Sequence, residues 1–253
     1  DISFAMLALG LSAVSIFAME ISFVFYNAML PSVARENEFG RASGFAWGLG
    51  YAGAIVALAI VLLLFVLPDH PAFGVSTEGA GHIRITMCFA ALWLCLFAIP
   101  MFVLVPAPPA ARSSVPFLAG LKDSLRIAMA IPGMPRFLLA RMLFADGLVT
   151  LFAFGGIYAA TVFGFSQTMV LVFGIILNIT AGIGAALGGV ADDRFGSIRV
   201  MRGCLVALAA LGLVAILAPG EAVFWAAGAA LGLGIGPLQS SARAYVARRT
   251  PPA

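Results

Sequence analysis

The chain has 253 residues, of which 62% are hydrophobic and 10% are charged, whereas soluble domains average roughly 45–50% and 25%. This composition excludes an ordinary soluble domain and indicates an all-α membrane protein. The net charge of +3 does not indicate nucleic-acid binding, because the basic residues form no continuous stripe. Cys88, Cys95 and Cys204 lie in apolar segments without metal-ligand spacing, so we expect no metal site, no cofactor and no disulfide framework.

Apolar segments of membrane-spanning length follow one another along the chain and predict a polytopic bundle of seven transmembrane helices. They cover residues 3–30, 45–67, 84–106, 137–163, 167–191, 200–218 and 222–242. The Pro-rich stretch 106–116 is predicted to be a linker, and residues 117–130 have the pattern of an amphipathic helix at the membrane surface. The chain begins abruptly inside its first apolar segment, without an initiator Met, which predicts a fragment of a longer protein.

Basic residues are distributed very unevenly between the two ends of these segments. Twelve of the 14 Lys and Arg residues fall in the loops 31–43, 107–136 and 192–199, at their borders or in the tail, whereas Arg84 is alone on the opposite side and Arg141 lies inside a segment. The twelve are Arg35, Arg41, Arg112, Lys122, Arg126, Arg136, Arg194, Arg199, Arg202, Arg243, Arg248 and Arg249. Because cytoplasmic loops are rich in Lys and Arg, we expect these loops and the tail in the cytoplasm, the N-terminus outside, and the protein in the plasma (inner) membrane.

The first apolar segment carries an ionisable residue far from its ends. Glu20 lies ten residues before Leu30, the predicted cytoplasmic end, which is about 15 Å at 1.5 Å per residue and near the middle of the bilayer. An ionisable group at that depth is costly and is a candidate functional residue. Asn27 is a candidate for a polar cavity or packing group. The alternative is that Glu20 is protonated or paired and only holds helices together.

A second acidic residue is predicted at similar depth in the fourth segment. Asp146 lies ten residues after Arg136. Arg141 is about one turn inside the segment and can extend its charge to the interface, but residues five apart point about 140° apart, so it is a poor partner for Asp146. We therefore expect Asp146 to face another helix or a water-filled cavity. Arg141 itself, and Asn178 in the fifth segment, are further candidates for polar cavity or packing groups.

Glycines are placed for close helix packing in the second, fifth and seventh segments, and the seventh has Gly228, Gly232 and Gly236 at four-residue spacing. Gly40, Gly44 and Gly48 recur every four residues and so lie along one stripe of the second helix. Gly188 and Gly189 lie together near the end of the fifth segment. Small residues let the backbones of membrane helices approach closely, so these positions are predicted to be helix contacts.

The densest charge cluster, GGVADDRFGSIRVMR, occupies residues 188–202 between two apolar segments. It is predicted to be a tight loop, with Gly196 at a turn that other residues resist. Asp192 or Asp193 is expected to pair with Arg194 or to meet the N-terminus of a neighbouring helix, where backbone N–H groups favour an anion. The alternative is a solvated loop that only follows the distribution of basic residues.

This cluster resembles the G-x-x-x-D-R-x-G loop signature of the major facilitator superfamily. Gly189, Asp193, Arg194 and Gly196 occupy its fixed positions, and basic residues follow. In that family the loop joins the second and third helices of each six-helix half and acts as a cytoplasmic latch between helices during alternating access. The latch residues that the resemblance implies are Gly189, Asp192, Asp193, Arg194, Gly196 and Arg199.

Longer stretches are similar to one branch of the superfamily, the vacuole effluxer (autophagy-related permease-like) family. They are FYNAMLP and GRASGFAWGLGYAG within 25–53, FLLARMLFADGLVTLFAFGGIYA at 137–159, FGIILNITAGIGAALGGVADDRFGSIR at 173–199 and GIGPLQSSARAYVARRTPP at 234–252. They resemble the fourth-to-fifth helix region, the seventh helix, the eighth helix with its loop, and the end of the tenth helix. Because the family has twelve helices in two halves, the resemblance implies a partial major-facilitator fold with helices four to ten. The implied parts are 1–106 from the first half, 107–136 as cytoplasmic linker, and 137–253 from the second half.

The resemblance implies a secondary active transporter that moves a small polar solute by alternating access, with amino acids as the suggested solute class. Glu20 and Asp146 are the candidates for proton coupling or for binding an amine. The implied partners are the lipid bilayer, the solute and the missing helices of the parent chain. A second hypothesis is a seven-helix receptor or binding protein without transport, although a retinal Schiff base is excluded because Lys122, the only lysine, lies in a loop. An enzyme is not predicted, since H-E-x-x-H and G-x-S-x-G motifs are absent.

Overall fold

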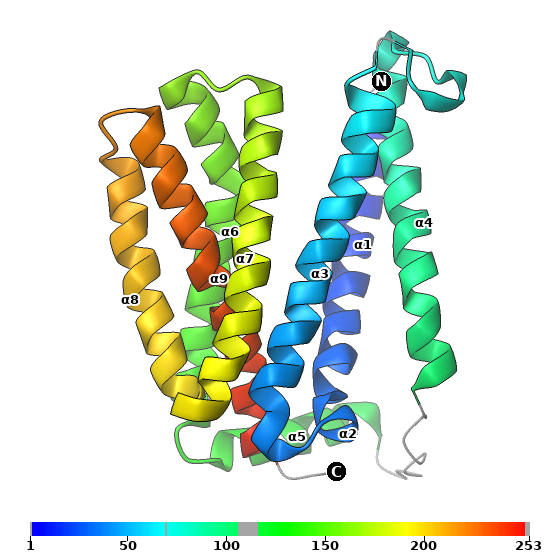
Figure 1. Cartoon of the computed structure of the whole chain (residues 1–253). Helices are drawn as coiled ribbons and strands as arrows, with labels where there is room; N and C mark the ends of the chain where they lie inside the picture. Colours follow the sequence, from blue (N-terminus) through cyan, green and yellow to red (C-terminus); the bar gives the residue numbers. More distant parts are fainter. Residues whose placement is uncertain (1, 69, 106–115, 251–253) are drawn as a thin grey trace. The chain divides into compact units, whose positions relative to one another are not determined.

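The structure, a computed structural model of the chain, describes residues 2–68, 70–105 and 116–250. In these ranges the chain forms helices joined by turns, without a strand (Figure 1). The α-helices are α1 (Ile2–Ala28), α2 (Leu30–Val33), α3 (Phe39–Val61), α4 (Gly81–Leu104), α5 (Phe117–Ala130), α6 (Met134–Phe163), α7 (Gln167–Phe195), α8 (Ser197–Ile216) and α9 (Glu221–Arg249). Shorter elements are the 3-10 helices η1 (Glu36–Glu38), η3 (Ala72–Gly74) and η4 (Glu78–Ala80), and the π-helical continuation of α3, η2 (Leu62–Val66).

Seven helices in the described part of the chain are long and apolar enough to cross a membrane, which confirms the predicted all-α membrane fold. They are α1, α3 with η2, α4, α6, α7, α8 and α9. Three predicted boundaries are wrong. The predicted loop 31–43 is shorter, because α3 already begins at Phe39. The predicted loop 192–199 reduces to Gly196, and the predicted tail is largely the end of α9, which runs to Arg249.

Tertiary contacts explain why α7 continues past the apolar segment. Acidic residues near a helix C-terminus oppose the helix dipole, so Asp192 and Asp193 indicate a loop when only the local sequence is considered. In the structure both carboxylates have basic or N–H partners on other helices. The helix ends only at Gly196, whose φ of 87° is unfavourable for other residues and whose N–H donates to the Asp192 carbonyl at 2.8 Å.

The predicted amphipathic helix is present as α5. Its exposed apolar residues Leu118, Leu121, Leu125 and Met129 follow helical spacing. With 14 residues it is about 21 Å long, too short to span the roughly 30 Å hydrocarbon core. The predicted linker 106–116 lies, except for its last residue, outside the described residues. The proposed division of the chain into three parts therefore stays a prediction.

The chain divides into two compact units, which are described separately. The first comprises Asp1–Leu49 and Thr180–Ala253, and the second comprises Gly50–Ile179. Helices α3 and α7 contribute residues to both units. Helices α1, α8 and α9 belong to the first unit, and α4, α5 and α6 belong to the second.

In the first unit, α3 and α7 approach each other at glycines. A Cβ on Gly44 would overlap the carbonyl oxygen of Ala185 and lie 2.9 Å from the Cα of Gly189. A Cβ on Gly40 would lie 2.6 Å from the Gly189 carbonyl oxygen. No side chain fits between the two backbones at these points, which confirms the predicted packing role of this glycine stripe.

Helix α7 makes a second close contact with α9. A Cβ on Gly188 would overlap the ring of Pro237, and one on Gly184 would overlap the carbonyl oxygen of Leu233. From the other side, a Cβ on Gly236 would overlap the carbonyl oxygen of Ala181. Helix α8 precedes α9 and lies alongside it as a helical hairpin (Figure 1). The end of α7 is thus held closely between α3 and α9.

In the second unit, aromatic residues surround the turn between α6 and α7. Phe165 is buried, and its ring centre lies 6.2 Å from that of Phe163 and 6.4 Å from that of Phe173. The turn uses Gly164, whose φ of 68° ends α6 in the left-handed region. This cluster fixes where α7 begins.

We expect Gly44→Ala to lower the free energy of unfolding by about 1–3 kcal/mol, because the added methyl group must displace the α7 backbone. Gly50→Ala is the matched control on the same helix, since a Cβ there meets nothing within 4 Å. Denaturation of both variants in detergent measures the difference. Equal stability of the two variants would show that the α3–α7 contact does not require glycine.

Candidate functional site

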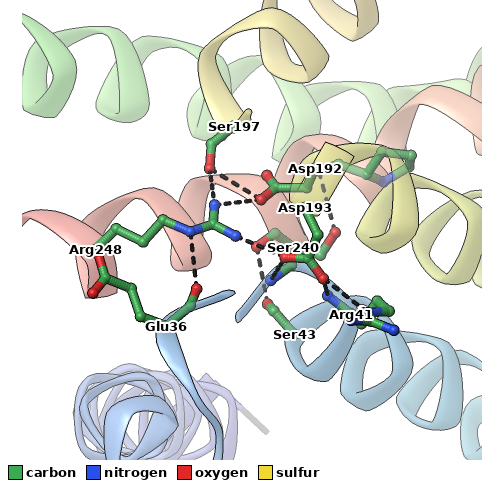
Figure 2. Close-up of polar contacts among 10 residues, drawn as sticks. Glu36, Arg41, Ser43, Asp192, Asp193, Ser197, Ser240 and Arg248 are labelled. Carbon is green, nitrogen blue, oxygen red and sulfur yellow. Dashed lines mark hydrogen bonds and ion pairs between the residues drawn. The ribbon is translucent and has the colours of Figure 1, made fainter. Parts of the chain in front are cut away.

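A carboxylate near the end of α7 caps the start of α3. Asp193 Oδ1 accepts a hydrogen bond from the Gly40 N–H at 2.7 Å, and Oδ2 accepts one from the Arg41 N–H at 2.9 Å (Figure 2). The first N–H groups of a helix lack partners within it, and the helix dipole favours negative charge there. This geometry requires a glycine, because a Cβ on Gly40 would lie 2.5 Å from Asp193 Oδ1.

Arg248, in the last turn of α9, bridges two carboxylates of α7 (Figure 2). Its Nη1 donates to Asp192 Oδ1 at 2.5 Å, and its Nη2 donates to Asp193 Oδ1 at 2.8 Å. Nη1 also donates to the hydroxyl of Ser197 at 2.7 Å, and that hydroxyl donates to Asp192 Oδ1 at 3.2 Å. One guanidinium group thus connects the end of α9 with the end of α7 and the start of α8. Through Asp193 it is also connected with the start of α3.

The centre of this network is buried and its edge is open to solvent. The Asp192 side chain is 0% exposed, whereas that of Arg248 is 22% exposed. A buried carboxylate is costly unless it is paired and hydrogen-bonded, so Arg248 compensates the burial of Asp192. Arg41 Nε also lies 3.2 Å from Asp193 Oδ2, but the Arg41 side chain is 48% exposed, so this pair contributes little stability.

Two further contacts join the same helix ends. The buried Ser43 hydroxyl of α3 donates to the Ser240 carbonyl oxygen of α9 at 2.9 Å (Figure 2). Leu30, Phe39 and Ala244 form a buried apolar cluster that joins α2, the start of α3 and the end of α9. We call the network of Asp192, Asp193, Ser197 and Arg248, together with the capped start of α3, the latch.

The structure distinguishes between the arrangements expected for the acidic pair. Asp193 meets the N-terminus of a neighbouring helix, as one of the predictions stated. The other prediction, pairing with Arg194, is not observed among the described residues. Gly189 lies in the tight α3–α7 contact, and Gly196 forms the turn that allows α8 to begin.

The other two predicted latch residues, Arg194 and Arg199, are exposed and contact Phe195. The guanidinium carbon of Arg194 lies 5.4 Å from the ring centre of Phe195. Arg199 Nη1 donates to the carbonyl oxygen of Phe195 at 3.2 Å. Neither residue takes part in the network around Asp192 among the described residues.

The sequence alone does not indicate a functional role for Arg248, Ser197, Ser43 or Ser240. It places Arg248 in a cytoplasmic tail, because the last apolar segment ends about two turns earlier. A signal was present, since basic residues are favoured in the last turn of a helix. No local pattern, however, indicates that this cation reaches the acidic pair of α7.

Two of the intramembrane candidates lie on α1, in the first unit. Glu20 is exposed along this helix. Asn27 is half-buried, and its Oδ1 is buried without a hydrogen-bond partner among the described residues. These placements leave the functional roles of both residues as predictions.

The other three candidates belong to the second unit. Arg141 is half-buried, with its guanidinium carbon 5.0 Å from the ring centre of Phe144. Asp146 is exposed on the same helix. The Asn178 side-chain amide donates to the Gly174 carbonyl at 2.8 Å, one turn earlier in α7. Their predicted roles in solute or proton binding are likewise untested by these contacts.

These features define an integral membrane protein in which charged groups join the ends of α3, α7, α8 and α9 within the first unit. The sequence model of the family described as "Vacuole effluxer Atg22 like" matches residues 3–253, so the chain belongs to this family of permeases of the major-facilitator type. No curated protein and no solved structure matches the chain. Family membership supports a role in membrane transport and agrees with a function other than catalysis.

We expect Arg248→Met to destabilise the protein by about 3 kcal/mol, because it leaves the buried Asp192 carboxylate uncompensated. The double variant Asp192→Asn with Arg248→Met should recover part of this loss, since the unpaired charge is removed as well. Unfolding in detergent measures each free energy.

Arg199→Met is the control for this series, because Arg199 is exposed and its loss should change stability by less than about 0.5 kcal/mol. Equal effects of the Arg248 and Arg199 substitutions would contradict a stabilising role for the latch.

Proposed function

We propose that this protein is a secondary active transporter that moves a small polar solute by alternating access. In this proposal the latch closes the cytoplasmic ends of the helices. The observation that supports it most is that one arginine, Arg248, joins the ends of α7, α8 and α9 through charged contacts, with Asp193 extending them to α3. The family to which the chain belongs supports transport in general.

Charged contacts are suited to a latch that must open and close repeatedly. In the closed state, pairing offsets the cost of removing the charges of Asp192, Asp193 and Arg248 from water. When the helix ends separate, water can solvate the same charges again. The two states then differ by a small free energy, which the binding of a solute can reverse. An apolar interface of similar size would instead expose hydrophobic surface on opening.

The resemblance of four long stretches to the vacuole effluxer family favours amino acids as the solute, and Glu20 and Asp146 as candidates for proton coupling or amine binding. The same resemblance, to helices four to ten of a twelve-helix transporter, leads us to propose that further helices complete the transporting unit.

We propose that the latch end faces the cytoplasm and that the N-terminus lies outside, in the plasma (inner) membrane. The distribution of basic residues supports this sidedness, and the same sidedness would apply in a vacuolar membrane.

We expect the double variant Glu20→Gln and Asp146→Asn of the full-length protein, with its further helices, to abolish most uptake of radiolabelled amino acids by proteoliposomes, together with its pH dependence. A proton-coupled carrier needs a group that binds and releases the proton within the membrane. Unchanged uptake with unchanged pH dependence would exclude these two residues from coupling. Saturable binding without any flux in the unaltered protein would favour the receptor hypothesis instead.

We expect Asp193→Ala to increase cytoplasmic access to the interface between α3 and α9. In a background without native cysteines, Ser43→Cys introduces a thiol at a position that is 0% exposed in the closed latch. A membrane-impermeant maleimide added to the cytoplasmic side should label this thiol several-fold faster when Asp193 is replaced. Arg194→Ala serves as the control, because this neighbouring charge lies outside the latch. Equal labelling rates in the two variants would contradict the latch proposal.

A further inference from the structure

Arg243 is a buried cation in α9, one to two turns before the latch arginine. The residue is 9% exposed. Its Nη2 donates to the backbone carbonyl of Tyr26 in α1 at 2.9 Å, and its guanidinium carbon lies 4.0 Å from the centre of the Tyr26 ring. The guanidinium plane is therefore held in place by an aromatic ring and one neutral acceptor.

These contacts leave much of the hydrogen-bonding capacity of Arg243 unused. Nε and Nη1 are buried and have no hydrogen-bond partner among the described residues. In the same part of the chain, the ion pairs of the carboxylates involve Arg41 and Arg248, and none involves Arg243. A buried charge without an opposite charge is strongly unfavourable, and a buried unsatisfied group in a folded protein calls for a specific explanation.

A second unsatisfied group lies beside Tyr26 in the sequence. Asn27 Oδ1 is buried and lacks a partner among the described residues, and this oxygen can only accept hydrogen bonds. Helix α9 therefore carries unused donors with a positive charge, and the adjoining turn of α1 carries an unused acceptor. A molecule with a carboxylate and a hydrogen-bond donor is complementary to both groups.

We infer that Arg243 binds the carboxylate of the transported solute. This inference rests on the proposed transport function and assigns the residue that holds the carboxylate of the proposed solute. Nε and Nη1 are enclosed in the present state, so the solute reaches them only when α1 and α9 separate. Arg243 lies five residues, about 7.5 Å along α9, from Arg248, so opening of the latch would uncover this site.

The inference can be tested by ligand-induced stabilisation of the purified protein in detergent, a readout that does not require transport. The probes are the L-amino acids, their α-amides, which lack the carboxylate, inorganic phosphate and a short-chain phosphatidylglycerol. We expect at least one amino acid to raise Tm and its amide to have no effect. In Arg243→Gln the apparent Kd of that amino acid should rise roughly 30-fold or more, because a charged hydrogen bond is lost.

Two other variants make the result interpretable. Arg249→Gln removes an exposed cation from the same helix and should leave the apparent Kd unchanged. Arg243→Lys keeps the charge but loses the planar donors, so it should weaken binding less than Arg243→Gln. The Tm of each variant without ligand reports whether it is folded, and Arg243→Lys provides the comparison if Arg243→Gln is not.

Several outcomes would overturn the inference: equal stabilisation by an amino acid and its amide, binding that is unchanged in both Arg243 variants, or no stabilisation by any amino acid. Arg243-dependent stabilisation by phosphate or the phospholipid alone would also overturn it, because the site would then accept a phosphate group. Flux measured on the same variants separates the two proposals. If transport does not depend on Arg243, the proposed function is retained and the Arg243 site is rejected. If binding depends on Arg243 but no flux occurs, the site is retained and the transport function is rejected.

Discussion

The pairing of Arg248 with the two carboxylates of α7 is the interaction on which the organisation of the first unit depends. Asp192 is fully buried and needs a cation, and Asp193 needs partners that offset its place near a helix C-terminus. Arg248 provides the cation for Asp192. For Asp193, Arg248 and the first N–H groups of α3 together provide the partners. Each buried or partly buried charge is thus stabilised by residues from other helices.

Close backbone packing makes this pairing possible. The Asp193 carboxylate of α7 reaches the N–H groups of α3 only because Gly40 and Gly189 let the two backbones come together. On the opposite side, Gly188 accommodates Pro237 of α9. The glycines therefore do more than allow packing, because the close approach of the backbones sets the distances between the charged groups. In the proposed alternating-access cycle, short contacts without interlocked side chains would allow this interface to close tightly and to open again.

Arg243 contrasts with Arg248 on the same helix. Arg248 donates to two carboxylates, a hydroxyl and the Glu36 carbonyl oxygen, whereas Arg243 is more buried and is held by a ring and one carbonyl oxygen. Both arginines have the same charge and similar positions in the sequence, and the sequence pattern predicts a tail for both. Their different surroundings arise from helix rotation: residues five apart point about 140° apart, so the two side chains meet different neighbours.

The sequence by itself determined that the protein lies in a lipid bilayer, that it is helical and approximately where its spanning segments lie, because hydrophobicity over roughly 20 residues is a local property. It also indicated the glycine contacts, the amphipathic α5 and the meeting of an aspartate with a helix N-terminus. Tertiary structure decided that α7 continues through Asp192 and Asp193, that Arg248 rather than Arg194 pairs with them, and that Arg243 is enclosed beside Tyr26. These outcomes depend on which helices lie together. Partners more than 50 positions apart leave no periodic pattern in the chain, so only the folded arrangement reveals them.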